Sequence, residues 1–478
     1  MKKLTAFLLA ICLLFSVALL ASCASDMGGS SYPGGFIGKG EAENGSSRGD
    51  GYFGSGDMSP TAPEGGDFGG GSSGEGMPVP PMEDGDMPDS DGGVDDVAPD
   101  EEVDSEDGEK IENDQVILPS GMITAGAWND NYNYEMWLDM FSQGESVGKF
   151  YQYTMPSYSW GYNSLDRVKV AVTSGGAPVS GASVVATDDN GAALFSAVTD
   201  AKGIAYLFVN SESGKISVTS GNGTAEAEFS KDSREIAVDL AEKAEKLNVI
   251  EIMFVVDVTG SMGDEIYFLK AELADVINRI AENNTETVIK LAFLFYRDQN
   301  DSVPFDYYDF TDVTTDAGLA AQQAALNKQG AKGGGDYPEA VDEALDMAVN
   351  AQWSTGATTK LIFHVLDAPA HNGAKYKEKL VNATKIAAEK GIRLCPIICS
   401  GAMGDTEYTM REAAIYTGGT FIFVTDDSGI GGSHHDPNLP NVTVELLNSL
   451  MVRLVNGYHT GSFADPVYWK EDPNLATK

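Results

Sequence analysis

The chain has 478 residues, 42% of them hydrophobic, which is enough for two or three globular domains that each bury a core. Its formal net charge at pH 7 is -41, from 31 basic and 72 acidic side chains. This charge argues against nucleic acid as a partner, because binding to nucleic acid begins with cationic contacts to phosphate. It favours solubility and is compatible with the binding of cations.

Residues 1–22 have the pattern of a secretion signal, in which Lys2 and Lys3 precede a mostly apolar run from 4 to 20. The small residues Ala21 and Ser22, directly before Cys23, resemble a bacterial lipobox. This resemblance implies cleavage before Cys23 and acylation of its thiol, which would anchor the chain to the extracytoplasmic face of the cell membrane, at the cell surface or in the periplasm. An ordinary signal peptide and an N-terminal membrane helix are the alternatives, although the run is marginal in length for a membrane span.

Residues 23–115 are predicted to be a disordered acidic linker, rich in glycine, serine and proline. Apolar residues are too sparse in this stretch to offset the entropy lost on ordering. We expect it to be a spacer between the lipid anchor and the folded part of the chain.

An aromatic-rich lead-in follows at 116–164, with a short helix predicted over 131–141. Aromatic side chains can stack on sugars, but packing against a neighbouring domain is the more common use. We therefore expect this lead-in to cover part of the next domain.

Residues 165–240 are predicted to form an all-β sandwich of about seven strands, because short alternating runs are separated by turn sequences such as Asp-Asn-Gly. The stretches 177–182 and 199–205 resemble carboxypeptidase regulatory-like (transthyretin-like) modules. The resemblance implies a spacer or adaptor without chemistry of its own.

From 245 to 460 buried strands alternate with helices, which predicts a doubly wound, Rossmann-like α/β sheet; residues 461–478 are a C-terminal tail. Helices are expected at 261–282, 337–351 and 440–457, among others. The strand expected over 392–399 contains Cys395 and Cys399. Four residues along a strand span about 13 Å, so these two cysteines are predicted to be buried free thiols.

Oxygen-bearing side chains gather where the predicted strands of this α/β region end. Asp257 ends the first strand, Thr259 and Ser261 lie on the turn into the first helix, and Asp367 ends a later strand. These residues resemble the metal-ion-dependent adhesion site of a von Willebrand factor type A (vWA) domain. The resemblance implies a divalent-cation site, and oxygen ligands of this kind suit Mg²⁺, with Mn²⁺ or Ca²⁺ as alternatives.

One position departs from the commonest pattern of this family, which supplies a threonine from the loop before the third helix. The chain has Gly-Gly-Gly-Asp there, and we assign the role to Asp336. Asp298 and His371 are expected on the rim of the same site, whereas the adjacent pair His434 and His435 is expected to be exposed to solvent.

Capping is an alternative role for the helix-proximal residues of this set. Ser261 with Asp264, and Asp336 with Glu339, also fit the spacing of helix capping boxes.

These observations predict a membrane-anchored binding or adhesion protein that engages a protein ligand, extracellular or in the cell envelope, through a divalent cation. A scaffold of an envelope complex with a saturated metal site is the alternative. A metal-dependent hydrolase is less favoured, and we expect no enzyme activity, since no nucleophile with an oriented base and no His-Glu-x-x-His motif occurs.

Overall fold

The computed structural model describes residues 120–144, 147–335, 337–356, 358–430, 432–437 and 439–476. The predicted signal peptide, Cys23, the predicted linker, residues 116–119 of the lead-in and Asp336 lie outside these ranges. Within the ranges, no helix combines the length and the apolar character needed to cross a membrane.

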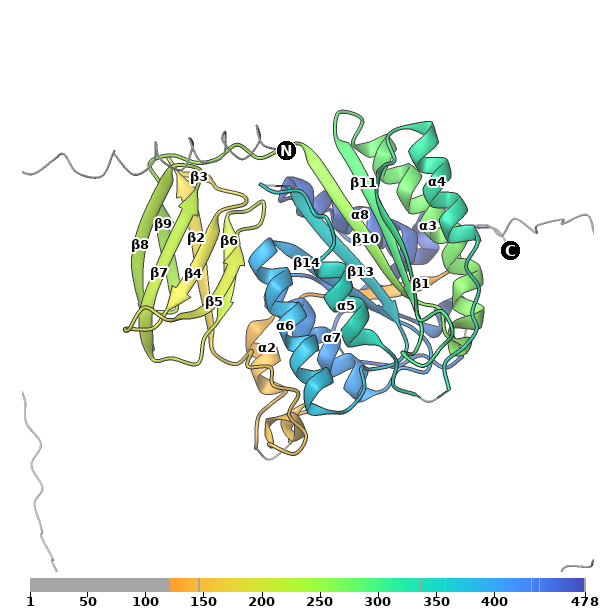
Figure 1. Cartoon of the computed structure of the whole chain (residues 1–478), viewed down its shortest axis with the longest axis horizontal. Coiled ribbons are helices and arrows are strands. Elements are labelled where there is room, and N and C mark those ends of the chain that lie inside the picture. The colour runs from red at the N-terminus through yellow and green to blue at the C-terminus, as the bar shows by residue number, and fades with distance from the viewer. Residues whose placement is uncertain are drawn as a thin grey trace, which may run out of the picture. The chain divides into compact units, whose positions relative to one another are not determined.

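Eight strands form the main sheet in the order β12-β11-β10-β13-β14-β15-β1-β16. Figure 1 labels β11, β10, β13, β14 and β1 of this sheet. The parallel strands are β10 (Val249–Asp257), β11 (Val288–Tyr296), β13 (Thr359–Leu366), β14 (Ile392–Ile398) and β15 (Phe421–Val424). The antiparallel strands are β12 (Phe305–Asp312), β1 (Thr124–Trp128) and β16 (Glu445–Leu446). The central strands β10 and β13 are buried at every residue except Val249, as expected of a parallel sheet covered on both faces.

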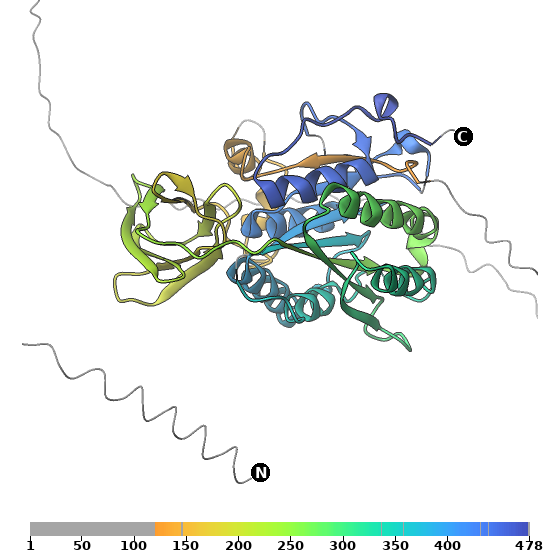
Figure 2. The same ribbon diagram turned by 90° about the horizontal axis from the view of Figure 1, so that it is seen from above.

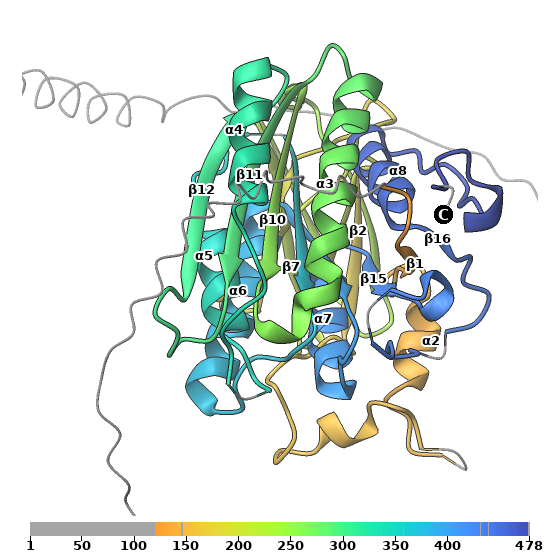
Figure 3. The same cartoon turned by 90° about the vertical axis from the view of Figure 1, so that its right-hand side faces the viewer.

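Helices cover both faces of this sheet (Figures 2 and 3). Successive side chains of a strand point to opposite faces, so Ile252 and Phe254 of β10 join one buried cluster while Met253 and Val255 join the other. The first cluster is closed by α3 (Gly263–Asn283), α4 (Asp316–Asn327) and α8 (Leu447–Thr460). The second is closed by α5 (Val341–Val349), α6 (Ala374–Lys390) and α7 (Gly404–Thr417). Cys395 and Cys399 are free and buried, as predicted.

Two of the expected helices begin at least four residues later than predicted. The helix expected from 337 starts at Val341, because the backbone N–H of Glu339 donates to the carbonyl of Pro369 (3.0 Å) and Glu339 bridges to Ala370. The helix expected from 440 starts at Leu447, because the two residues before it form β16 and pair with β1. In both places pairing with a distant segment overrides the local helical pattern.

The lead-in belongs to the main sheet. Its strand β1 pairs antiparallel with β15 over four residue pairs and with β16 on its other side. The helix predicted over 131–141 is confirmed in a shorter form, α2 (Tyr134–Asp139), whose Trp137 is buried. A 3-10 turn, η1 (Tyr151–Thr154), follows. The lead-in therefore completes the α/β domain, which the sequence pattern placed at 245–460.

Residues 167–239 form two four-stranded sheets, one strand more in total than the seven expected. One sheet contains β2 (Arg167–Ser174), β3 (Ala177–Pro178), β6 (Ile204–Phe208) and β9 (Glu235–Asp239). The other contains β4 (Ser183–Thr187), β5 (Ala193–Val198), β7 (Ser213–Ser220) and β8 (Gly223–Ser230). Alternate residues of both sheets, such as Val170 and Val184, lie in one buried cluster.

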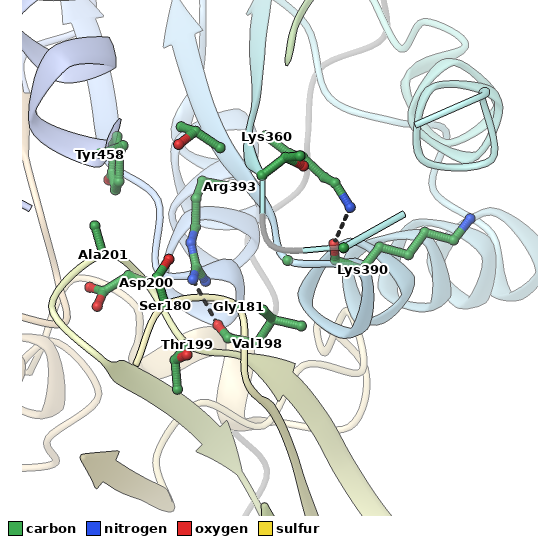
Figure 4. Close-up of a pocket in the computed structure, with 14 residues that line it drawn as sticks. Ser180, Gly181, Val198, Thr199, Asp200, Ala201, Lys360, Lys390, Arg393 and Tyr458 are labelled. Atoms are coloured by element: carbon green, nitrogen blue, oxygen red, sulfur yellow. Dashed lines mark hydrogen bonds between the residues drawn. The ribbon is translucent and has the colours of Figure 1, made fainter. Parts of the chain in front are cut away.

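Side chains of the α/β domain contact this all-β region directly. Tyr416 of α7 stacks on Phe208 with ring centroids 4.8 Å apart. The guanidinium of Arg393 donates to the carbonyls of Thr417 (2.6 Å) and Val198 (2.7 Å), and it lines a small pocket with Lys360 (Figure 4). Arg393 therefore links β5 to the C-terminal end of α7 through hydrogen bonds to one backbone carbonyl of each element.

Candidate metal centre

The candidate site lies at the carboxyl edge of the main sheet. Strands β10 and β13 are parallel neighbours, with Val256 opposite Val365. Asp257 is the last residue of β10 and Asp367 directly follows β13, so the two carboxylates emerge at the same edge. In open α/β sheets this edge is where ligands bind.

The turn after β10 brings two hydroxyls to these carboxylates. Both the backbone N–H and the hydroxyl of Thr259 donate to Asp257 Oδ1, at 2.9 and 2.7 Å. Ser261, in the 3-10 turn η2 (Gly260–Met262), has its Oγ 3.3 Å from Thr259 Oγ1, and its hydroxyl acts to lower the pKa of the neighbouring Asp367 carboxyl. Four of the five predicted ligands therefore converge.

One oxygen of each aspartate is buried without a hydrogen-bond partner, namely Asp257 Oδ2 and Asp367 Oδ1. Burial, followed by the charge of Asp367, raises the pKa of Asp257 to about 7. Burial also raises the pKa of Asp367. Unpaired buried carboxylate oxygens are costly unless a cation or a donor compensates them.

The donor set fits a hard divalent cation. Two unpaired carboxylate oxygens lie beside two hydroxyls. Carboxylate and hydroxyl oxygens are ligands that Mg²⁺, Mn²⁺ and Ca²⁺ accept. The described ranges contain no group of three or more His, Cys, Asp or Glu side chains arranged to hold a metal ion. Among the described residues, the groups that could hold an ion at this edge are the two aspartates and the two hydroxyls.

A pocket of about 830 Å³ opens above these groups. Its wall includes Thr259, Ser261 and Asp367, the glycines of the loop before α5, and residues of the loops after β14 and β15. The further lining residues are Gly260, Gly333, Gly334, Gly335, Tyr337, Glu339, Ala368, Ser400, Gly401, Gly432 and Ser433. A partner group can thus approach the site from solvent.

The glycine loop that precedes Asp336 is hydrogen-bonded to the turn after β10, which carries Thr259 and Ser261. Gly260 N–H donates to the carbonyl of Gly333 (3.2 Å), and Lys332 N–H donates to the carbonyl of Val258 (3.0 Å). Gly333 and Gly334 have φ of +83° and +75°, which only glycine adopts without strain. Asp336 itself is outside the described residues, so its assignment as a ligand remains a prediction.

Glu339 is a site residue that the sequence pattern presented only as part of a capping box. It lines the pocket, is 4% exposed, and its Oε2 has no hydrogen-bond partner. Burial, together with the charges of Asp257, Asp298, Asp367 and Asp301, raises its pKa to about 9. The signal that could have indicated this role is the proline before it, which disfavours a helical conformation at residue 337 and so delays the helix.

The two expected rim residues contact each other. His371 Nε2 lies 2.7 Å from Asp298 Oδ1, and Asn300 donates to the other oxygen of Asp298 at 3.2 Å. Burial acts to raise the pKa of Asp298, but the hydrogen bond with His371, the charge of His371 and the backbone N–H groups of Gln299 and Asn300 together lower it. Neither residue lines the pocket, so the pair supports the loop beside the site.

The expectation that His434 and His435 are exposed is wrong. The side chain of His434 is 3% exposed and contacts Asp426 (2.8 Å), next to the 3-10 turn η3 (Asp426–Ser428). His435 lies 2.5 Å from the buried carboxylate of Glu407. These contacts hold the loop whose Gly432 and Ser433 line the pocket.

A further 3-10 turn, η4 (Trp469–Glu471), lies near the C-terminal end of the described residues.

Comparison with known proteins agrees with the predicted family of the α/β domain. Residues 251–425 match the family model of the von Willebrand factor A domain. No curated protein matches the chain.

Similar solved structures include the pilus adhesin SpaC from Lactobacillus rhamnosus GG, at 11% identity and a TM-score of 0.30, covering 43% of this chain and 30% of that one. The open conformation of that adhesin gives 10% identity and a TM-score of 0.32, covering 58% and 34%. The conserved hypothetical protein BatB from Bacteroides thetaiotaomicron gives 16% identity and a TM-score of 0.26, covering 36% and 89%. The chain thus spans about a third of the adhesin's length.

Proposed function

We propose that this chain is an extracytoplasmic binding or adhesion protein whose vWA domain engages a protein partner through one divalent cation. The observation that carries the proposal is the convergence of Asp257, Thr259, Ser261 and Asp367 at one sheet edge, where the last three line an open pocket and each aspartate has an unpaired buried oxygen. If this sheet edge had only a structural role, burying two unpaired carboxylate oxygens together would cost free energy without compensation.

The proposed roles follow from the chemistry of the side chains. Asp257 and Asp367 neutralise the ion, Thr259 and Ser261 contribute hydroxyl oxygens, and Asp336 completes the set on the basis of the sequence. Mg²⁺ is the favoured ion, with Mn²⁺ or Ca²⁺ as alternatives. When bound, the cation supplies a Lewis-acidic contact point for an oxygen of the partner.

The remaining parts of the proposal rest on the sequence. Acylation of Cys23 would anchor the chain to the membrane, and the acidic linker would hold the folded part away from the lipid surface. The all-β region would serve as an adaptor without catalytic groups. We propose a binding function and no enzyme activity.

A scaffold with a saturated metal site is the second candidate. The observation in its favour is Glu339, a further buried carboxylate that faces the same pocket. It would reduce the need for a ligand oxygen from a partner.

Calorimetric titration of the chain with Mg²⁺, Mn²⁺ and Ca²⁺, beside Asp257→Ala, tests the cation site. We expect one equivalent to bind the wild type and none the variant. A pull-down from envelope extract in Mg²⁺ and in EDTA then tests the partner, and capture only by the Mg²⁺-loaded wild type supports adhesion. A folded wild type that binds none of the three ions would refute the proposal.

A further inference from the structure

We propose that Arg297 and Asp301, in the loop after β11, are positioning residues of the cation site. They fix the glycine loop (residues 330–335), and the glycine loop in turn fixes the turn that carries Thr259 and Ser261. This inference rests on the proposed function, since it concerns the same site. It requires no contact between either residue and the ion.

Arg297 holds the glycine loop by its backbone carbonyls. The almost completely buried guanidinium donates from Nε to the carbonyl of Lys332 at 2.9 Å and from Nη2 to that of Gly330 at 3.5 Å. From Nη1 it donates to the carbonyl of Val303, in its own loop, at 3.1 Å. One planar side chain therefore joins the loop after β11 to two points of the glycine loop.

Asp301 holds the same loop by a backbone N–H. Its Oδ2 accepts from the N–H of Gly334 at 2.9 Å and from that of Asp298 at 3.2 Å. A Cβ placed on Gly333 would lie 2.5 Å from Asp301 Oδ1, so the carboxylate lies directly against the glycine backbone. Only residues without a Cβ allow so close an approach.

The glycine loop passes this constraint to the hydroxyls of the site. The N–H of Gly260, which lies between Thr259 and Ser261, donates to the carbonyl of Gly333 at 3.2 Å. One residue earlier in the glycine loop, the N–H of Lys332 donates to the carbonyl of Val258 at 3.0 Å. Lys332 thus accepts from Arg297 on one side and donates to the turn on the other, so a shift of the glycine loop would displace both hydroxyls.

The chemistry of the guanidinium suits this role. Within the described residues, Arg297 forms its hydrogen bonds with backbone carbonyls and forms no ion pair with a carboxylate. A guanidinium has five donors in one rigid plane, whereas the ammonium of a lysine is a single point at the end of a flexible chain. The positive charge of Arg297 also acts on the carboxyl of Asp257, so the experiment has to separate charge from geometry.

The test uses Mn²⁺ as the probe, bound to the full chain and measured by calorimetry, with thermal melting in EDTA to show that each variant folds. Arg297→Lys keeps the charge and loses the planar set of donors, whereas Arg297→Ala loses both. Asp301→Asn keeps an oxygen that can accept from Gly334, whereas Asp301→Ala removes it. Asp301 is half-buried, so its variants decide the question if Arg297→Ala does not fold.

Two further variants separate positioning from stability and from the site itself. Glu251→Gln is the control for stability, because Glu251 is buried at the opposite end of β10, where it accepts from Lys290 and Ser354. It should melt at a lower temperature than the wild type and bind Mn²⁺ equally well. Asp257→Ala should bind no Mn²⁺.

We expect Arg297→Lys, Arg297→Ala and Asp301→Ala to bind Mn²⁺ about tenfold more weakly than the wild type, the size typical of residues that orient metal ligands. Asp301→Asn should bind as the wild type does. Millimolar methylguanidinium should restore part of the affinity of Arg297→Ala and leave Asp301→Ala unchanged. A pocket of about 200 Å³, lined by Arg297, Asp301 and Gly333 among others, gives this probe access.

Wild-type affinity in Arg297→Lys would overturn the inference, because charge without the planar donors would then suffice. Equal affinities of Asp301→Asn and Asp301→Ala, or a tenfold loss in Glu251→Gln, would overturn it as well. A wild type that binds no Mn²⁺, or binding that survives Asp257→Ala, would instead refute the cation site, and the inference with it.

Discussion

The carboxylate of Asp130, in the lead-in, accepts a hydrogen bond from Nε of Arg411 at 3.0 Å, although the two residues are 281 positions apart. Both side chains are almost completely inaccessible to solvent. Arg411 also donates from Nη1 to Glu407 at 3.0 Å, and Glu407 contacts His435 of the pocket loop. The lead-in is thereby joined, through α7, to a loop that lines the candidate metal centre.

We expect Asp130→Ala to lower the free energy of unfolding by about 3 kcal/mol, because it leaves the buried guanidinium of Arg411 with one carboxylate in place of two. Urea denaturation measures the change. Asp139→Ala is the control, since Asp139 is exposed and its side chain should contribute little. Equal stability of the two variants would contradict a structural role for the Asp130–Arg411 pair.

A fragment of residues 245–460 should be less stable than a fragment of residues 120–476. The shorter fragment lacks β1, which pairs with β15 and β16, and so it exposes the backbone edge of β15. Chemical denaturation and size-exclusion chromatography of both fragments measure the difference. If the shorter fragment is monomeric and equally stable, β1 is dispensable and the α/β domain is complete without the lead-in.

Glu412 should make stability depend on pH with a defined sign. Burial raises its pKa to about 8, above the ordinary value of 4.5, while Ser164 donates to its Oε1 at 3.0 Å. Below pH 4.5 both folded and unfolded forms are protonated. Between 4.5 and about 8 only the unfolded form ionises, so the contribution of this group falls as the pH rises, by about 1.4 kcal/mol per pH unit at most.

Glu412→Gln should therefore exceed the wild type in stability by a margin that grows from pH 5 towards pH 8. Denaturation curves across this range, compared between the two proteins, isolate the effect from that of other carboxyls. A margin that stays constant with pH would show that Glu412 is ionised in the folded state.

Gly334→Ala should weaken the cation site as well as the fold. The residue has φ +75°, and an added Cβ would crowd Glu339 Oε1 and Thr259. Gly176→Ala is the matched control, because Gly176 has φ +81° and nothing within 4 Å of the added Cβ. Both variants should lose about 1 kcal/mol from left-handed strain, and only Gly334→Ala should also lose cation affinity, by about tenfold. Equal cation affinity in both would place Gly334 outside the site.

The sequence by itself determined the parts of this protein whose signals are local. Apolar runs ended by Asp257 and Asp367 indicated buried strands, and a carboxylate followed by two hydroxyls in one short turn predicted the candidate ligand set. Strand and helix periods are set by the backbone, and hydrogen bonds within a turn such as that from Thr259 to Asp257 need no distant partner.

Only the tertiary structure decided the features that depend on segments far apart in the chain. It placed the lead-in strand β1 beside β15, delayed the helix after Pro338 by pairing Glu339 with the segment after Asp367, and buried His434 against Asp426. It also placed Glu339, which the sequence presented as part of a capping box, in the lining of the pocket. The physical reason is that strand pairing, and the partners that compensate a buried charge, depend on segments far apart in the chain, so no local pattern records them.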